Sequence, residues 1–224
     1  KVGVIKNIQE FGISKNVINA YETSKTVLSG LGHKLVEVDF SELTSGICSY
    51  YVIAPAECSS NLSRFDGVKY GYRSKGAKDI ANLYMNTRSD GFGDEVKKRI
   101  LIGTHVLSAG FYDAYYLQAQ KVRRMIKLKF ENFFKDVDLI FMPTTLDQAF
   151  EKNRKSDDPN RMYKEDLLTI PANLAGLPAI SFPNGFKNNL PIAGQLIGKY
   201  FGEDLLLNTT NKIQEVTDWH KMTP

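Results

Sequence analysis

The first forty residues contain the pattern that most constrains the fold: a strand, a helix and a second strand in succession. Val2–Ile5 is an apolar run, and Leu35–Val38 alternates apolar and polar side chains as strands do. Between them, apolar residues recur at helical spacing until Gly30 and Gly32, which favour a helix end. Such a unit predicts two parallel strands joined by a right-handed crossover, in a sheet flanked by helices.

Hydrophobic periodicity and turn residues predict the rest of the elements. We expect helices at 44–61, 94–109, 113–134, 163–175 and 203–216, and strands at 138–142, 179–182 and 194–198. Pro55 should distort the first of these helices, and Pro143 should take the first of these strands out of the sheet, because proline has no N–H. Asn188-Asn189 predicts a hairpin turn between the last two strands, and a polar loop should run to Arg161.

One side of the helix at 44–61 is expected to be apolar. The residues that share this side by helical spacing are Ile47, Tyr51, Ala54 and Cys58.

Composition places the chain among globular proteins without selecting a partner. The 224 residues are 42% hydrophobic, which is enough for a sizeable core. The 29 basic and 25 acidic residues leave a net charge of +4, which does not by itself predict nucleic-acid binding. Cys48 and Cys58 lack the paired spacing of a zinc site, so we expect reduced thiols. No apolar run is long enough to span a membrane.

Several kinds of active site find no support in the sequence. The three histidines, His33, His105 and His220, are too scattered to indicate a metal site or a Ser/His/Asp triad. No glycine-rich phosphate-binding loop is present. One cluster of serines has no general base near it in the sequence: Ser59, Ser60 and Ser63. We therefore expect no catalytic residue and no metal site in these residues.

Five motifs, in order, carry a family resemblance. They are Tyr50–Gly71, Gly91–Thr104, Tyr112–Tyr116, Gln120–Arg123 and Pro171–Ser181. Together they resemble the A subunits of glutamine-dependent glutamyl-tRNA(Gln) amidotransferases, which are amidase-signature enzymes. The resemblance implies the amidase-signature α/β fold, a mixed central β-sheet covered by helices on both faces.

The signature sequence of that family has no match in this chain. In the family, this Gly/Ser-rich sequence carries a nucleophilic serine, a bridging serine and a lysine base. We interpret Lys1 as an internal position, because Val2–Ile5 resembles the strand that follows the signature. Residues 1–224 are then expected to be the C-terminal portion of a single amidase-signature domain, inactive alone and with an exposed sheet edge that favours aggregation.

The resemblance also implies which residues hold the substrate. A free amino acid needs a cation for its carboxylate, an anion for its ammonium group and a surface for its side-chain amide. Arg99, Asp166 and Tyr50 match the family residues with these three roles. Because Tyr51 is adjacent to Tyr50, a register shift of one residue would exchange the two. Without the family, Arg99 would be interpreted as a surface charge, Asp166 as a solvent-facing or capping residue, and Tyr50 as part of the core.

The implied function is glutamine hydrolysis inside a heterotrimeric amidotransferase. The A subunit would release ammonia, and the B subunit would use it with ATP and Mg²⁺ to convert Glu-tRNA(Gln) to Gln-tRNA(Gln), while the C subunit holds the other two together. The implied partners are thus the B and C subunits. No cofactor or metal is expected in the A subunit itself, and no contact with a membrane. The implied location is the bacterial cytoplasm or an organelle matrix.

Two alternatives stay open at this point. The chain could belong to a stand-alone amidase that acts on another amide, although an apolar amide would leave Arg99 and Asp166 without partners. It could also be a noncatalytic scaffold that binds the partner subunits. The missing signature sequence is the only support for the scaffold.

Overall fold

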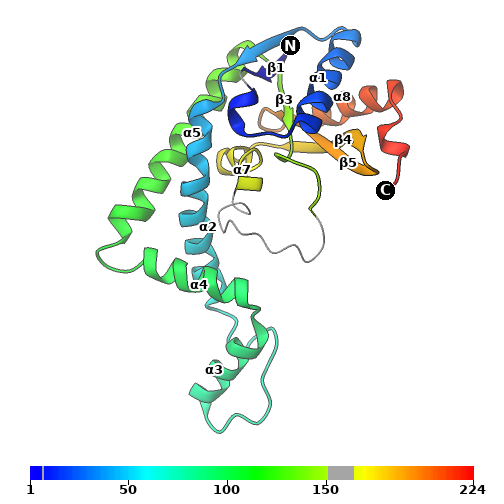
Figure 1. Cartoon of the computed structure of the whole chain (residues 1–224). Coiled ribbons are helices and arrows are strands. Elements are labelled where there is room, and N and C mark those ends of the chain that lie inside the picture. The colour runs from blue at the N-terminus through cyan, green and yellow to red at the C-terminus, as the bar shows by residue number, and fades with distance from the viewer. Residues whose placement is uncertain (7, 151–163) are drawn as a thin grey trace. The chain divides into compact units, whose positions relative to one another are not determined.

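The computed structural model describes residues 1–6, 8–150 and 164–224, shown in Figure 1. The chain divides into two compact units. We call Lys1–Ile47 with Arg123–Pro224 the sheet unit, and Cys48–Val122 the helical unit. The expectation of a single domain stays a prediction. Within the described ranges, no helix combines the length and the apolar character that crossing a membrane requires.

The sheet unit contains a five-stranded sheet with the order β2-β1-β3-β5-β4. Its strands are β1 (Val2–Ile5), β2 (Leu35–Val38), β3 (Leu139–Pro143), β4 (Ala179–Lys187) and β5 (Leu190–Gly198). β1 is parallel to β2 and β3, whereas β5 is antiparallel to β3 and β4. This confirms the predicted mixed α/β fold class, including the parallel pair of strands at the start of the chain.

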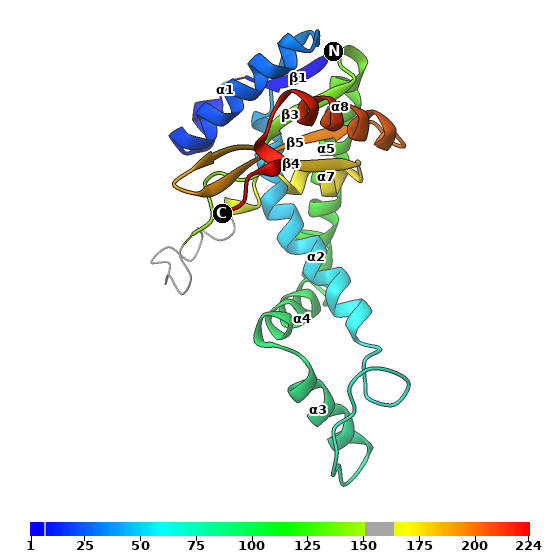
Figure 2. The same cartoon turned by 90° about the vertical axis from the view of Figure 1, so that its right-hand side faces the viewer.

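Helices cover both faces of this sheet. The sheet unit includes α1 (Lys15–Gly30), α7 (Ile170–Ala175), α8 (Glu203–Val216) and the second part of α5 (Leu117–Asp136). Its short 3₁₀ helices are Ile8–Phe11, Ser41–Ser45 and Trp219–Lys221. α1 and α8 contact each other and also β4 and β5, so they share one face, and Figure 2 shows α7 on the other side of the sheet.

The core of the sheet unit includes a buried tyrosine. Tyr21 of α1 is fully buried, and its ring stacks on Phe141 of β3 at 5.2 Å. The N–H of Ile5 donates a 2.7 Å hydrogen bond to the Tyr21 hydroxyl. Burial raises the pKa of Tyr21 above its ordinary value, so the phenol stays neutral.

The β4–β5 hairpin has the predicted turn. Asn188 and Asn189 have φ values of 52° and 61°, which a two-residue type I′ hairpin turn requires. Asparagine tolerates this left-handed region better than most residues do. The two strands pair from Lys187↔Leu190 to Ala179↔Ile197, so both are longer than the sequence predicted.

Two predictions around prolines were wrong. Pro143 does not leave the sheet: it ends β3 in register with Gly194 of β5, beyond Val4↔Phe141, the last pair between β1 and β3. A missing N–H is tolerated at such a position. The predicted helix at 163–175 is helical at Lys164 and Glu165, forms a turn through Thr169 and becomes α7 only at Ile170. Pro171 is the second residue of this helix, in the first turn, where the missing N–H of proline is tolerated.

Two positions named by the sequence predictions cannot be placed. Tyr163, the start of the predicted helix, and Arg161, the end of the predicted polar loop, fall outside the described residues.

The helical unit contains α3 (Ile80–Gly91), α4 (Asp94–Val106), a π-helical turn at Tyr112–Tyr116, and parts of α2 (Gly46–Leu62) and α5. The sequence predicted every helix here except α3, with ends that differ by a few residues. α2 continues through Pro55. The four residues expected on the apolar side of α2 are half-buried, and the buried positions of this helix are Gly46, Ser49, Ile53, Pro55 and Ala56.

Candidate functional site

Arg99 lies in the middle of α4, with its side chain 40% exposed. Its guanidinium Nη2 is 3.4 Å from Oε1 of Glu95, one turn earlier on the same helix, and that carboxylate is 47% exposed. Exposed ion pairs of this kind contribute roughly 0–1 kcal/mol to stability. Replacing Glu95 by the carboxylate of a ligand would therefore cost the guanidinium little free energy.

Tyr50 lies near the start of the helical unit, on α2. Its ring meets the ring of Tyr51 edge to face, with centroids 5.1 Å apart and an angle of 86° between the planes. Both tyrosines are half-buried. Since neither ring is enclosed in the core, burial does not separate them, and the choice between Tyr50 and Tyr51 stays a prediction.

Within the helical unit, α2 and α4 are in close contact. A Cβ atom at Gly103 would overlap the backbone carbonyl of Pro55 and approach Ser59 Cβ. Ser59 Oγ also lies 2.9 Å from Thr104 Oγ1, so the hydroxyl of Ser59 pairs with another hydroxyl rather than with a general base. This agrees with a structural role for Ser59.

Helical geometry relates this contact to Arg99. Arg99 precedes Gly103 by four residues, and residues four apart share one face of a helix. Arg99 is therefore on the side of α4 that meets α2, the helix that carries Tyr50. No sequence pattern indicated this contact, because a single glycine or serine within a helix does not show whether another helix packs against it.

Asp166 lies in the sheet unit, in the turn before α7. Its carbonyl oxygen accepts hydrogen bonds from the N–H groups of Thr169 at 3.2 Å and Ile170 at 3.0 Å, and from the Thr169 hydroxyl at 3.2 Å. The residue itself is half-buried, whereas Leu168 is fully buried. The main chain around Asp166 is thus fixed by its own hydrogen bonds and by an anchored leucine.

A buried glutamine that the sequence analysis missed contacts the same turn. Gln195 of β5 is 4% exposed, and its Nε2 donates hydrogen bonds to the carbonyls of Leu168 at 2.9 Å and Pro143 at 3.1 Å. One signal in the sequence could have indicated it: Gln195 is a single amide side chain in a predicted strand that continues with the apolar residues Leu196 and Ile197.

The predicted substrate residues are divided between the two units. Tyr50 and Arg99 belong to the helical unit, and Asp166 belongs to the sheet unit. Among the described residues, no group of three or more His, Cys, Asp or Glu side chains could hold a metal ion.

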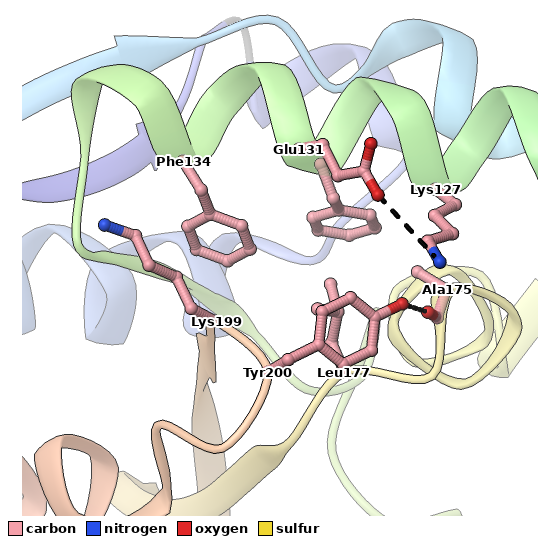
Figure 3. Close-up of a pocket in the computed structure, with 8 residues that line it drawn as sticks. Lys127, Glu131, Phe134, Ala175, Leu177, Lys199 and Tyr200 are labelled. Carbon is pink, nitrogen blue, oxygen red and sulfur yellow. Dashed lines mark hydrogen bonds and ion pairs between the residues drawn. The ribbon is translucent and has the colours of Figure 1, made fainter.

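A pocket of about 180 Å³ lies elsewhere in the sheet unit (Figure 3). Its lining residues are Lys127, Phe130, Glu131, Phe134, Ala175, Leu177, Lys199 and Tyr200. Lys127 Nζ is 3.9 Å from Glu131 Oε1 and 5.2 Å from the centre of the Tyr200 ring, and the Tyr200 hydroxyl donates to the Ala175 carbonyl. The remaining lysine, Lys199, pairs with Asp138 outside the pocket at 3.3 Å. Because its polar groups already have partners and it contains none of the predicted site residues, we do not assign an amino-acid ligand to it.

Comparison with curated proteins shows close relatives. The chain is 51% identical over 224 residues to the A subunit of the glutamyl-tRNA(Gln) amidotransferase of Coxiella burnetii (strain Dugway 5J108-111). It is 52% identical over 223 residues to the corresponding protein of Hahella chejuensis. All of this chain is matched in both cases, and it spans 46% of the length of each relative.

Solved structures and a family model support the same relationship. The crystal structure of the A subunit of glutamyl-tRNA(Gln) amidotransferase from Thermotoga maritima matches the whole chain with a TM-score of 0.73 and 36% identity, over 44% of that protein. The 6-aminohexanoate cyclic dimer hydrolase has a TM-score of 0.72 at 19% identity, over 46% of its chain, which shows a shared fold. The Amidase family model matches residues 1–207. The chain therefore belongs to the amidase family.

Proposed function

We propose that this chain is part of the glutaminase subunit of a tRNA-dependent amidotransferase, which supplies ammonia for converting Glu-tRNA(Gln) to Gln-tRNA(Gln). One observation carries the proposal. Identity to the A subunit of such an amidotransferase is 51% across all 224 residues, whereas the 6-aminohexanoate cyclic dimer hydrolase, which has the same fold, is 19% identical. Agreement that extends over the whole chain at this level favours a shared substrate as well as a shared core.

Three side chains recognise glutamine in this proposal. Arg99 binds the α-carboxylate, because its planar guanidinium can form two parallel hydrogen bonds and its present partner, Glu95, is exposed and weakly bound. Asp166 receives the α-ammonium group from a turn whose main chain is fixed. Tyr50 lies beside the side-chain amide.

The bond-breaking groups come from residues other than these 224 in the same proposal. A nucleophilic serine, activated by a lysine through a bridging serine, attacks the glutamine amide, and backbone donors stabilise the oxyanion. The chain tested alone is then inactive. The B and C subunits are the partners, ATP and Mg²⁺ act at the B subunit, and the glutaminase subunit holds no cofactor.

The test uses the complete protein with its partner subunits and measures kcat and KM for glutamine. Arg99→Ala and Asp166→Ala should each raise the glutamine KM by about tenfold or more, since each removes a charge-assisted hydrogen bond. The matched controls are Lys98→Ala, which removes a 71% exposed cation that also pairs with Glu95, and Glu165→Gln beside Asp166.

Two results would count against the proposal. Unchanged kcat and KM for glutamine in both alanine variants, with folding preserved, would contradict the assignment of Arg99 and Asp166 to glutamine binding. Faster hydrolysis of a simple aliphatic amide than of glutamine by the wild-type complex would favour a stand-alone amidase.

A further inference from the structure

Gln195 connects two chain segments that meet at one face of the sheet. It lies on β5 opposite Met142 of β3 and Ser181 of β4, so it has a strand on each side. Side chains alternate along a strand, and Gly198 faces Leu206 of α8, so Gln195 lies on the opposite face. There its amide reaches the carbonyls of Leu168 and Pro143.

We propose that Gln195 is a positioning residue for Asp166, the side chain to which the proposed function assigns the ammonium group of glutamine. Leu168 follows Asp166 by two residues, and its carbonyl is held 2.9 Å from the Gln195 amide. The Asp166 carbonyl closes the other end of the same turn through its bonds to Thr169 and Ile170. The inference rests on the proposed function, because only there does Asp166 contact substrate.

The chemistry of the amide group explains why glutamine occupies this position. Its NH₂ group has two N–H donors, and two carbonyl oxygens lie within hydrogen-bonding distance of it. A buried polar group is costly unless it is hydrogen-bonded, so an apolar residue here would leave both carbonyls without this donor. The Leu168 carbonyl is then free to turn toward other donors, and the Asp166 turn can shift with it.

A small shift of this turn has a specific consequence for binding. The strength of the ion pair between a carboxylate and an ammonium group depends on their distance and orientation. A misplacement on the order of 1 Å strongly reduces what a positioned group contributes to the reaction. Gln195 does not contact the substrate in this proposal. Its loss should therefore act on glutamine binding, seen in KM, more than on the chemical step, seen in kcat.

Gln195→Met in the complete protein, with partner subunits present, tests the role. We expect the glutamine KM to rise about tenfold, the effect of weakening one charged contact, with kcat within about twofold. The matched control is Asn184→Leu: Asn184 is 2% exposed in the same sheet, but its amide donates to Ser24 of α1 on the other face. This control should lose comparable stability and keep the wild-type KM.

Hydrogen exchange gives a readout that does not depend on activity. The amides of Thr169 and Ile170, which donate to Asp166, should exchange faster in Gln195→Met and at the wild-type rate in Asn184→Leu. If Gln195→Met does not yield folded protein, Gln195→Asn provides the same comparison, because its shorter side chain cannot reach both carbonyls.

Asp166→Ala separates the two proposals. If Asp166→Ala raises the glutamine KM and Gln195→Met changes neither KM nor exchange, the positioning role is overturned and the proposed function stands. An equal rise of KM in the Asn184→Leu control would also overturn it, since any loss of core polarity would then suffice. If Asp166→Ala leaves KM unchanged, the role of Asp166 in the proposed function fails, and the positioning role fails with it.

Discussion

Gly103 of α4 lies directly against the backbone carbonyl of Pro55 in α2, with no space for a side chain between them. This contact joins the helix of Arg99 to the helix of Tyr50 inside the helical unit, and the Ser59–Thr104 hydroxyl pair at 2.9 Å lies beside it. The obstacle is main chain, which cannot rotate away as a flexible side chain can. Position 103 therefore controls how closely the two helices approach.

Gly103→Ala should separate α4 from α2. Overpacking of this kind typically costs about 1–3 kcal/mol, so we expect a lower thermal midpoint and a higher glutamine KM in the complete protein. The control is Gly30→Ala at the end of α1, where a Cβ would meet nothing within 4 Å and φ is ordinary. Thermal unfolding and glutamine kinetics of both variants check this, and a Gly103→Ala protein with wild-type values would contradict the close contact.

The Tyr50–Tyr51 pair can be resolved by removing one hydroxyl at a time. Because the rings pack edge to face, each phenylalanine variant keeps the ring contact and loses only the hydroxyl. We expect Tyr50→Phe to raise the glutamine KM by about three- to tenfold, the effect of one hydrogen bond, and Tyr51→Phe to leave it unchanged. A higher KM in Tyr51→Phe alone would assign the contact with the glutamine side chain to Tyr51. An unchanged KM in both variants would show that neither hydroxyl contacts glutamine.

Asp79 gives α3 a pH-dependent N-terminus. Its Oδ1 accepts a 2.8 Å hydrogen bond from the Asn82 N–H, and its Oδ2 accepts one of 2.7 Å from the Asn82 side chain. These bonds, the backbone one first, hold the pKa of the carboxyl below its ordinary value. A carboxyl with a lowered folded-state pKa stabilises the fold above its unfolded pKa of about 3.9 and loses this effect as pH falls through the folded value.

Asp79→Ala should therefore weaken α3 at neutral pH and have little effect in acid. The measurement is hydrogen exchange of the α3 amides in the complete protein between pH 7 and pH 3, corrected for the intrinsic rate. Asp79→Asn keeps an acceptor at the helix N-cap and should remain close to wild type at pH 7. A difference between wild type and Asp79→Ala that grows toward acid would show that the sign is wrong.

Local patterns in the sequence predicted much of the fold. Adjacent asparagines were enough for the hairpin turn, and α8 was predicted with its observed bounds because its apolar spacing is regular. α3 was missed because its only buried residues are Leu83 and Thr87, too few for a periodic signal.

Less of the candidate site than of the fold could be predicted from the sequence. The roles of Arg99, Asp166 and Tyr50 came from family resemblance, since isolated charges and tyrosines are common on ordinary surfaces. The contacts that support these residues join distant positions: Gly103 meets Pro55, and Gln195 meets Leu168. Because tertiary structure brings such pairs together, no local sequence pattern predicts these contacts.

Arg99→Lys separates geometry from charge at the proposed carboxylate contact. Lysine keeps the positive charge but loses the planar fork that binds both carboxylate oxygens, so kcat/KM for glutamine should fall about tenfold or more. Stability should change little, because the 3.4 Å pair with Glu95 is exposed. Lys98→Arg is the reverse exchange at the neighbouring position and should be neutral, because that side chain is 71% exposed. If Arg99→Lys retains the wild-type kcat/KM, charge alone suffices at this position and the two-point contact with glutamine is wrong.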